Sequence, residues 1–410
     1  MSVKKEEEIR EVIVEKNVGF NMVEVIIMII ISILFGILVG TVVSGSKKSV
    51  GGVKVSRELQ EFITTYNNVN DNYYGKISEQ ELVNAAIEGM ISKLDDPYSV
   101  YMDSKETEEF NQTVDGSYVG IGATVGAKDK DNYIVSMFEK SPAEKSGLKV
   151  GDIFIKVDGK DVRGMEISKL TSLIKGTENT DVDITVLRDG KEITKTVTRA
   201  SIDIPSVTSE VINKDNKKVG YIYISSFAAN SYGQFRSELK ELENKKIDSL
   251  IIDVRSNPGG HLDQVTKILE LFMNKNKVLY QVESKGKRTK KYSSTKENRK
   301  YDIVVLIDPA SASASEILAA AFKESYDNAT LVGVKSYGKG TVQKAYQLSG
   351  GASFKYTTEK WLTPKGNWID KAGVSPDIEV KLGDKYKDDP KKENDLQLQK
   401  AIEILTKKES

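Results

Sequence analysis

Residues 303–343, IVVLIDPASASASEILAAAFKESYDNATLVGVKSYGKGTVQ, decide the fold. The apolar, β-branched run Ile303–Ile307 predicts a buried parallel strand, which Asp308-Pro309 ends. The run 317–322 has the composition and apolar spacing of a buried helix, and residues 330–334 predict a second strand. The stretch therefore predicts an α/β layer, and the residues around its turns are candidates for a reaction site.

A serine stands at the entrance of the predicted helix. Small residues there leave the first helical N–H groups without partners, and the helix dipole favours negative charge at that end. The hydroxyl of Ser313 is therefore a candidate nucleophile. Taken alone, the run 313–316 is more typical of a capping box, in which Ser313 caps the helix and Glu316 reaches back to it.

A lysine follows the second predicted strand. Lys339 lies between Gly338 and Gly340, so the backbone can bend sharply and aim the long amine inward. Burial among apolar groups disfavours the ammonium form and would make Lys339 a general base. Gln343 lies four residues on, on the same face, and its amide could orient the amine without charge. A Gly-Lys-Gly segment on its own is usually a solvated turn.

Together, the runs 311–316 and 338–343 resemble the motifs of the carboxyl-terminal processing peptidases, which are serine endopeptidases with a Ser/Lys dyad. The resemblance implies that Ser313 is the nucleophile, Lys339 the base and Gln343 the orienting amide. The interval between Ser313 and Lys339 is one residue longer than is usual in the family. We place the extra residue in a loop at 326–329, where it should be harmless. The sequence leaves open which serine of the run attacks.

A glycine-rich turn, Arg255–Gly260, follows a predicted strand at 250–254 and opens a helix. Glycines at such a turn expose the N–H groups that an oxyanion hole requires, although a glycine-rich turn without function is as common. The resemblance implies that Gly259 or Gly260 forms an oxyanion hole with the N–H of Ala314. Position 261 is usually apolar or aromatic in the family, so His261 is a departure. We expect His261 at a helix N-terminus rather than in catalysis.

Composition excludes several classes of site. The chain has 410 residues, 60 Lys plus Arg, 60 Asp plus Glu, one histidine and no cysteine. Thiol catalysis and a disulfide framework are excluded, and a zinc site built from His and Cys is disfavoured. The balanced charge gives no net attraction to nucleic acid, and the basic stretch 285–300 is more typical of a solvated hairpin. The chemistry predicted above needs no cofactor and no metal.

The first residues predict a membrane anchor. Residues 25–43 are apolar apart from a few small or hydroxyl side chains, and at about 1.5 Å per residue they span roughly 28 Å. A cleaved signal peptide is the rival interpretation, but no Ala-x-Ala site follows. We expect a cytoplasmic segment at 1–24, a transmembrane helix at 25–43 and a flexible linker at 44–54. The family resemblance favours a single-pass protein of the cell membrane with its catalytic part extracytoplasmic.

Two amphipathic helices are predicted in the next segment, which we define as an N-terminal helical domain at 55–112. The first has an apolar stripe that includes Leu59 and Phe62, and the second is capped by Ser78 and Glu81. The pair Asp95-Asp96 after these helices is more typical of a helix terminus and turn set by Pro97 than of a metal or acid/base site.

Residues 113–200 resemble a PDZ domain. The run 141–152 has proline near the start of a short helix, a glycine cap and a tight turn, and residues 167–174 predict the groove helix. Family members tend to have arginine where Lys175 stands. The N–H groups expected to bind a peptide's terminal carboxylate belong to a loop and strand: Tyr118, Val119, Gly120, Ile121 and Gly122.

The peptidase core is placed at 201–383, because strand 219–224, a helix around Phe235 and strand 250–254 predict a parallel layer. A charged linker and a final helix fill 384–410. The apolar stripe of that helix is a candidate dimerisation surface: Leu398, Ala401, Ile402 and Leu405.

These features predict a membrane-anchored serine endopeptidase with a crotonase/ClpP-like α/β core and an inserted PDZ domain. Its expected partners are proteins or peptides with free C-termini, the membrane, and a second copy in a homodimer, but not nucleic acid. Two other functions remain open. A non-catalytic PDZ adaptor would bind C-terminal peptides without cutting them, and an acyl-transferring hydratase, which shares the core fold, would need an acyl-thioester pocket.

Overall fold

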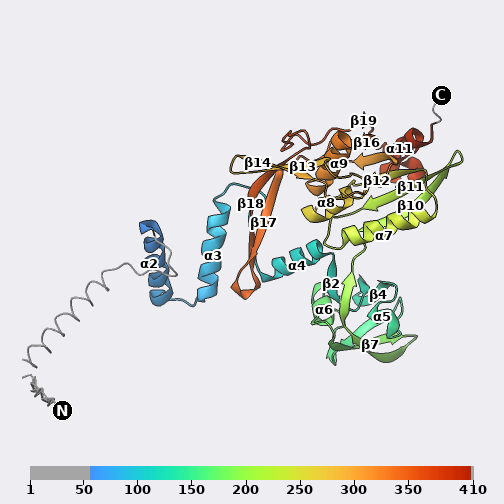
Figure 1. Cartoon of the computed structure of the whole chain (residues 1–410). Coiled ribbons are helices and arrows are strands. Elements are labelled where there is room, and N and C mark those ends of the chain that lie inside the picture. The colour runs from blue at the N-terminus through green and yellow to red at the C-terminus, as the bar shows by residue number, and fades with distance from the viewer. Residues whose placement is uncertain (1–55, 408–410) are drawn as a thin grey trace, which may run out of the picture. The chain divides into compact units, whose positions relative to one another are not determined.

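The computed structural model describes residues 56–407 (Figure 1). The chain divides into two compact units after Leu82. The predicted segments 1–24, 25–43 and 44–54 lie outside the described residues. Within 56–407, no helix is long and apolar enough to cross a membrane. The domain boundaries drawn from the sequence stay predictions.

The two predicted N-terminal helices are present as α2 (Arg57–Asn72) and α3 (Glu79–Ser92). Ser78 Oγ accepts a hydrogen bond from the N–H of Glu81 at 3.2 Å, and the Glu81 carboxylate accepts one from the N–H of Ser78 at 2.7 Å. This reciprocal pair confirms the predicted capping box, which satisfies two N–H groups at the start of α3.

A six-stranded sheet forms the centre of the second unit. Its strand order is β10-β11-β12-β15-β16-β19, and the pairs from β11 to β19 are parallel while β10 is an antiparallel edge. The predicted parallel layer is therefore confirmed. The strands are β10 (Val207–Lys214), β11 (Lys217–Ile224), β12 (Ser249–Asp253), β15 (Asp302–Ile307), β16 (Ala329–Gly333) and β19 (Ile378–Glu379).

Helices cover both faces of this sheet (Figure 1). Alternate strand residues point to opposite faces, so Ile303 and Val305 pack in one apolar cluster while Val304 and Leu306 pack in another. The first cluster contains α7 (Ser231–Asn244), α8 (Leu262–Leu269) and α9 (Ala314–Ser325), and the second contains α11 (Leu396–Thr406).

The apolar stripe of α11 is buried against the chain's own sheet. Leu398 is 2% exposed and Ala401 is fully buried, in one cluster with Val304 and Leu306. The interpretation of this stripe as a dimerisation surface is therefore wrong. The linker expected before it contains a short helix, α10 (Asp384–Asp388), and a 3-10 turn, η2 (Lys392–Asn394).

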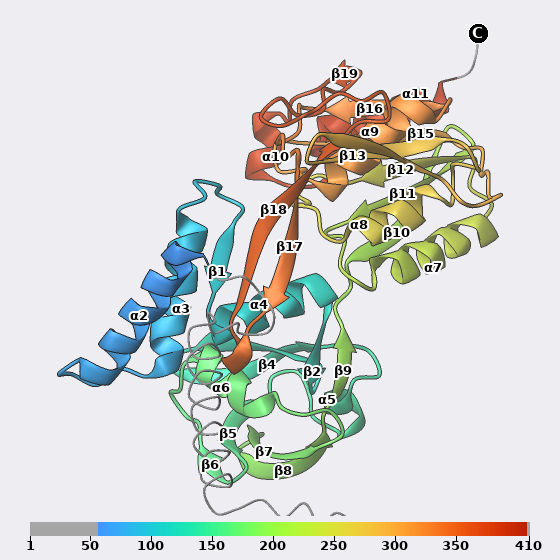
Figure 2. The same cartoon turned by 60° about the vertical axis from the view of Figure 1, so that its left-hand side comes forward.

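A second, antiparallel sheet has the order β1-β18-β13-β14, with β17 also paired to β18. Figure 2 shows the long β17–β18 hairpin running out from the core toward α4 (Ser104–Asp115). We did not predict this helix, although the capping box of Asp103 and Glu106 marks its start. The strands are β1 (Val100–Met102), β13 (Val278–Ser284), β14 (Lys287–Tyr292), β17 (Thr341–Gln347) and β18 (Ser353–Leu362), and η1 (Ser349–Gly351) lies at the hairpin tip.

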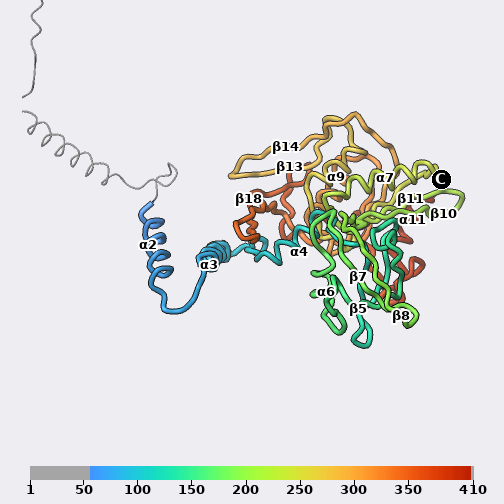
Figure 3. The backbone as a smooth tube through the Cα atoms, turned by 90° about the horizontal axis from the view of Figure 1, so that it is seen from below, coloured from blue at the N-terminus to red at the C-terminus, as the bar shows by residue number. Residues whose placement is uncertain are grey.

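The basic stretch 285–300 contains the turn and the second strand of the hairpin β13–β14, which can be followed in Figure 3. Every residue of β14 is exposed. The predicted solvated hairpin is confirmed.

The predicted PDZ region has its own apolar core and a sheet of order β3-β4-β5-β7-β8, with β6 paired to β5. The groove helix, α6 (Ile167–Ile174), has the predicted bounds, and β2 (Ser117–Gly120) pairs with β9 (Ala200–Asp203). The other elements are β3 (Ala123–Lys128), β4 (Asp131–Met137), α5 (Pro142–Lys145), β5 (Ile153–Val157), β6 (Lys160–Asp161), β7 (Asp181–Arg188) and β8 (Lys191–Thr198).

Candidate active site

One cavity of about 660 Å³ brings the predicted reaction residues together. It lies where the first turn of α9, the turn before α8 and the start of β17 meet. Lys355 of β18 and Phe110 of α4 also line it. The predicted residues in its wall are Ser313, Ala314, Lys339, Gln343, Gly259, Gly260 and His261.

Ser313 differs from the two serines that flank it. Ser311 Oγ donates to the carbonyl of Val254 at 2.8 Å and Ser315 Oγ donates to the carbonyl of Asn257 at 2.8 Å, and each side chain is fully buried. Ser313 instead lines the cavity. Its backbone has φ +53° and ψ −111°, a region costly for a residue with a Cβ and typical of functional turns.

A buried carboxylate joins the serine segment to the lysine segment. Glu316 Oε2 accepts from the N–H of Ser313 at 2.8 Å and from the N–H of Lys339 at 2.9 Å. Its Oε1 accepts from Ser336 Oγ at 2.6 Å and from the N–H of Gly338 at 2.7 Å. The predicted contact of Glu316 with Ser313 is present, but the carboxylate also fixes the backbone before Lys339, which the sequence did not indicate.

The Lys339 amine lies in surroundings that disfavour its charge. Burial lowers the pKa of Lys339 and the positive charge of Lys355 lowers it further, while Asp96 and Glu316 oppose the shift. Its Nζ lies 4.6 Å from the centroid of the Tyr98 ring. Among the described residues, no hydrogen bond joins Nζ to Ser313 or to Gln343. The structure thus brings the three side chains to one cavity without joining them.

Tyr98 presents a neutral ring to the amine. Burial, together with the contact with Tyr337, raises the pKa of Tyr98 to about 12. The phenol therefore keeps its proton in neutral solution, and the ring face attracts a cation through its quadrupole.

The amide of Gln343 is held by two threonines. Its Nε2 donates to Thr341 Oγ1 and to Thr357 Oγ1, each at 3.0 Å. The register of β17 against β18 shifts between Val342 and Gln343. Such a bulge re-aims a side chain at the point where it occurs, and here Gln343 lines the cavity.

The candidate oxyanion groups are not equivalent. The N–H of Gly259 donates to Asn257 Oδ1 at 2.8 Å, so it is engaged within the turn. The N–H groups of Gly260 and Ala314 have no acceptor in the described part of the chain. A Cβ added at Gly259 would lie 2.9 Å from the Cβ of Ser313, so this turn needs glycine to approach the serine.

His261 precedes the first residue of α8, as predicted from the sequence. Its Nδ1 lies 4.0 Å from Asp263 Oδ1, and its Nε2 is buried with no hydrogen-bond partner in the described residues. No hydrogen bond connects it to Ser313 in this part of the chain, so the geometry gives no Ser-His pair.

The predicted carboxylate-binding segment lies beside a small apolar cavity of about 210 Å³. Tyr118, Gly120 and Ile121 line it together with Ile174 and Lys175. Val119 pairs with β9, and Gly122 has φ +74°, with Ser141 so close that a side chain would not fit. The structure thus places the predicted loop against the groove helix α6.

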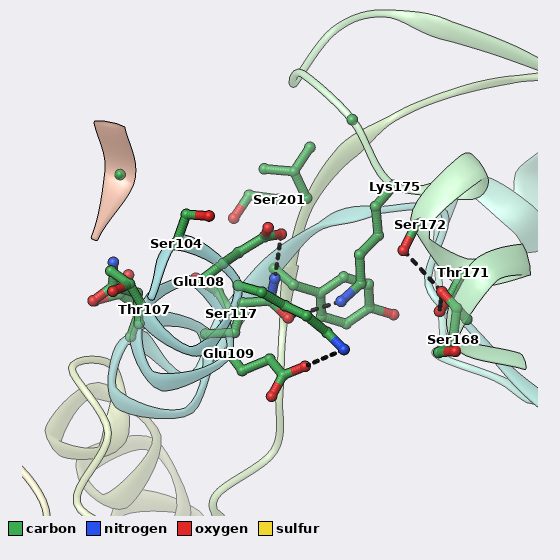
Figure 4. Close-up of a pocket in the computed structure, with 18 of the residues that line it drawn as sticks. Ser104, Thr107, Glu108, Glu109, Ser117, Ser168, Thr171, Ser172, Lys175 and Ser201 are labelled. Atoms are coloured by element: carbon green, nitrogen blue, oxygen red, sulfur yellow. Dashed lines mark hydrogen bonds and ion pairs between the residues drawn. The ribbon is translucent and has the colours of Figure 1, made fainter. Parts of the chain in front are cut away.

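A larger cavity of about 740 Å³ opens between α4 and α6. Figure 4 shows hydroxyl side chains of the two helices on opposite sides of it, with Lys175 between them. Lys175 Nζ donates to Gln112 Oε1 of α4 at 2.8 Å and lies 5.4 Å from the centroid of the Tyr118 ring. Lys175 therefore contacts the predicted peptide site and α4 at once.

The sequence did not indicate two side chains that lie in or near the cavity, Asp96 and Lys355. Asp96 accepts from Thr357 Oγ1 at 2.6 Å, although the sequence pattern indicates only a turn at this position. Lys355 lines the cavity with its Nζ 4.6 Å from the centroid of the Phe110 ring. The pair Asp95-Asp96 before Pro97 is the sequence feature that marks the first position, and no pattern marks a lysine inside an alternating strand.

Three family profiles match the chain. The profile described as peptidase family S41 matches residues 218–380, one described as a PDZ domain matches 133–188, and one described as the activating protease CtpB N-terminal domain matches 41–107. These matches cover most of the described core, the two N-terminal helices and the part of the PDZ region at 133–188, which does not include the segment Tyr118–Gly122.

Curated relatives match over most of their length. The carboxy-terminal processing protease CtpB of Bacillus subtilis (strain 168) is 40% identical over 353 residues, which are 85% of this chain and 72% of the relative. CtpA of the same organism is 40% identical over 321 residues, 78% of this chain and 68% of the relative. Among solved structures, the photosystem II D1 C-terminal processing protease aligns with 86% of this chain and 98% of its own, at 24% identity and a TM-score of 0.48.

Proposed function

The chain belongs to peptidase family S41 and is a serine-type peptidase with a PDZ domain, and from this we propose that it processes protein C-termini with a Ser313/Lys339 dyad. Gln343 orients the lysine, and the N–H groups of Gly260 and Ala314 form the oxyanion hole. No metal or cofactor takes part in the proposed reaction.

One observation supports the dyad above all others. Ser311 and Ser315 give their hydroxyls to backbone carbonyls, whereas Ser313 shares a cavity with a lysine whose pKa burial lowers. A serine becomes a nucleophile when a nearby base removes its proton. Lys339 is a base that the cavity offers, and Ser313 is the hydroxyl of the run that remains available to it.

The reaction follows from these groups. Neutral Lys339 takes the proton of Ser313 as Oγ attacks the substrate carbonyl, and the two N–H groups stabilise the developing oxyanion. The lysine then protonates the leaving amine, and an acyl group stays on Ser313. Water, deprotonated by Lys339, releases the acyl group and restores the hydroxyl. Catalytic hydrogen bonds often tighten only when substrate binds, so we infer that Lys339 and Ser313 close on each other in the complex.

We further propose that the PDZ region selects substrates by their free C-terminus. A terminal carboxylate would accept hydrogen bonds from N–H groups of the segment Tyr118–Gly122, and its last side chain would enter the apolar cavity beside Ile174. The ammonium of Lys175 would add a favourable charge. Proteins and peptides with free C-termini are therefore the proposed substrates.

The proposed location is the cell membrane, with residues 25–43 as a single-pass anchor and the catalytic part outside the cytoplasm. The length and apolar composition of this segment support the proposal. The homodimer also stays a prediction. Protease added to intact cells should digest residues after the anchor but spare a tag fused before Met1, whereas protection of the whole chain would contradict the proposal.

The dyad is tested by replacing its base. Lys339→Ala should lower kcat by about 10²- to 10⁴-fold or more, because Ser313 without a base is a poor nucleophile. Lys339→Arg should fail as well, since guanidinium keeps its proton. His261→Ala is the control and should keep most of the activity. Cleavage of an internally quenched, unstructured peptide measures all three, with near-ultraviolet circular dichroism as a check of folding.

The assay also separates the remaining function classes. An active Lys339 variant would contradict the dyad, and a loss in His261→Ala equal to that in Ser313→Ala would favour a histidine base. Labelling by a serine-reactive fluorophosphonate should occur in the wild type and disappear in Ser313→Ala. A chain that binds C-terminal peptides but neither cuts nor labels would be an adaptor.

A further inference from the structure

We propose that Asp96 is a positioning residue of this site, which acts through Thr357 to fix the orientation of the Gln343 amide. The inference rests on the proposed dyad and adds a residue for which the sequence indicates only a turn and the comparisons give no role. Asp96 lies in the loop between α3 and β1, far along the chain from β18, the strand that it contacts.

Hydrogen bonds connect Asp96 to its own loop and to β18. Its carboxylate accepts from Ser99 Oγ at 2.5 Å, from the N–H of Tyr98 at 3.1 Å and from Thr357 Oγ1 at 2.6 Å. Ser99 Oγ in turn accepts from the N–H of Thr357 at 3.1 Å. Two hydrogen bonds thus fasten the loop to β18 at the residue that also contacts Gln343.

The direction of these bonds decides how the amide lies. An ionised carboxylate only accepts hydrogen bonds, so the single hydroxyl proton of Thr357 must point to Asp96. The Thr357 oxygen can then only accept, and its partner on Gln343 must be the Nε2–H group, at 3.0 Å. The side-chain oxygen of Gln343 is left facing away from the threonines.

A second threonine completes the arrangement. Gln343 Nε2 also donates to Thr341 Oγ1 at 3.0 Å, which uses its other proton. Within the described residues, Gln343 Oε1 accepts no hydrogen bond, while Gln343 lines the same cavity as Lys339. A free amide oxygen can accept a hydrogen bond from a lysine ammonium. Through Thr357, Asp96 therefore determines that the oxygen of the Gln343 amide, and not its NH₂ group, is available to Lys339.

Asp96 also acts on the base through its charge. The ionisable groups that face Lys339 are Asp96 from the loop, Glu316 from α9, Lys355 from β18 and the phenol of Tyr98. Burial opposes ionisation of Asp96, but hydrogen bonds from Ser99 and Thr357 outweigh it, and the pKa of Asp96 is lowered. The resulting anion raises the pKa of Lys339. Removing that charge should therefore lower the pKa of the lysine.

A turn residue that served folding alone would predict a different result. Asp96 accepts from Tyr98 two residues on, as an aspartate does in a turn next to proline. That role would affect stability but would leave the pH dependence of the surviving enzyme unchanged. The contact with Thr357 and the charge on Lys339 go beyond it, and each has its own measurable effect.

The test compares two pairs of variants of the full chain on the quenched peptide. Asp96→Asn should lower kcat on the order of 10²-fold with KM near the wild-type value, and should move the acidic limb of kcat/KM to lower pH. Asp95→Asn is the matched control: Asp95 is exposed and has φ +51°, which asparagine tolerates, so its profile should match the wild type.

The second pair separates the hydrogen bond from the charge. Thr357→Val should lose kcat as Asp96→Asn does while the acidic limb stays in place, because the anion remains. Thr357→Ser keeps the hydroxyl and should restore kcat. The two Thr357 variants test the role of the Asp96–Thr357 hydrogen bond even if Asp96→Asn does not fold.

Three results would overturn the inference: wild-type kcat in Asp96→Asn, a loss in that variant without a shift of the acidic limb, or equal impairment of Thr357→Ser and Thr357→Val. An active Lys339→Ala variant would instead overturn the dyad itself. The two failures are therefore distinguishable in one set of assays.

Discussion

At the residue scale, two lysines with different proposed roles, Lys339 and Lys355, line the same cavity. Lys339 is the proposed base, while Lys355 lies over the Phe110 ring with no carboxylate within 4 Å among the described residues. Burial lowers the pKa of each amine, and the charge of Lys355 lowers that of Lys339 further. A second cation thus favours the neutral form of the base, as a like charge does wherever two ionisable groups meet.

Replacing Lys355 should therefore make Lys339 harder to deprotonate. In Lys355→Met the pKa of Lys339 rises because the opposing charge is gone, so the neutral fraction at a given pH falls. The acidic limb of kcat/KM should move to higher pH, opposite to the shift expected for Asp96→Asn. Methionine keeps the chain length and its contact with Phe110.

The control is Lys360→Met, on the same strand. Its Nζ lies 4.2 Å from the centroid of the Trp368 ring, and it is not among the residues lining the cavity. Its profile should match the wild type. A shift to lower pH in Lys355→Met, or no shift, would exclude the tuning role of Lys355.

At the scale of elements, α9 and the turn before β17 depend on one another through Glu316. Four donors converge on its two oxygens: the N–H groups of Ser313, Gly338 and Lys339 and the hydroxyl of Ser336. A fully buried carboxylate is tolerated because all these bonds are made. The strained serine and the lysine turn are thus held by one side chain.

Glu316→Gln should be destabilising out of proportion to its size. The amide NH₂ would face two donors instead of accepting from them, so two buried N–H or O–H groups lose their acceptor. We expect a loss of roughly 2–4 kcal/mol in the free energy of unfolding, together with loss of peptidase activity. Urea unfolding followed by tryptophan fluorescence measures the first.

Glu324→Gln is the matched control at the other end of α9. Its carboxylate accepts one N–H, from Lys365 at 2.7 Å, which a glutamine oxygen can still accept. The change should cost under about 1 kcal/mol. Equal stability losses in the two variants would contradict the bridging role of Glu316.

At the scale of the whole molecule, a chain of contacts runs from the PDZ groove to the reaction cavity. Lys175 contacts Tyr118 and Gln112, and Gln112 belongs to α4. Phe110, on the same helix, lies against Lys355 and lines the cavity of Ser313. A peptide that draws Lys175 toward its carboxylate would release Gln112, so binding and catalysis can be coupled through α4.

A free C-terminal peptide added in trans should therefore accelerate cleavage of a second, quenched reporter. A ligand shifts the enzyme only by its differential affinity for the active arrangement. The same peptide with an amidated terminus should have little effect, because the charge that the N–H groups favour is gone.

Reporter cleavage measured against peptide concentration distinguishes the alternatives. A fall in rate would mean that the groove captures substrate without activating the enzyme. Equal binding of free-acid and amidated peptides would exclude the carboxylate site at Tyr118–Gly122.

The order of elements could be predicted because local patterns specify it. The β-branched run Ile303–Ile307, the helix 167–174 and the basic hairpin each have a periodicity or turn chemistry that acts over a few residues, and all three are present. Helix α4 was missed because Phe110 and Val114 are its two large apolar residues, although the capping box of Asp103 marks its start. The stripe of α11 was predicted but its partner was not, because an apolar face does not specify what it packs against.

By itself, the sequence determined the fold class, the family and the candidate residues Ser313, Lys339 and Gln343, because these depend on residue type and spacing. Only the tertiary structure decided how the serines of the run differ, which glycine N–H is engaged, that Lys355 lines the cavity and that Asp96 contacts Thr357. Asp96 and Thr357 are 261 residues apart. Hydrogen bonds and charges act across space rather than along the chain, so contacts of this kind exist only once the strands have paired.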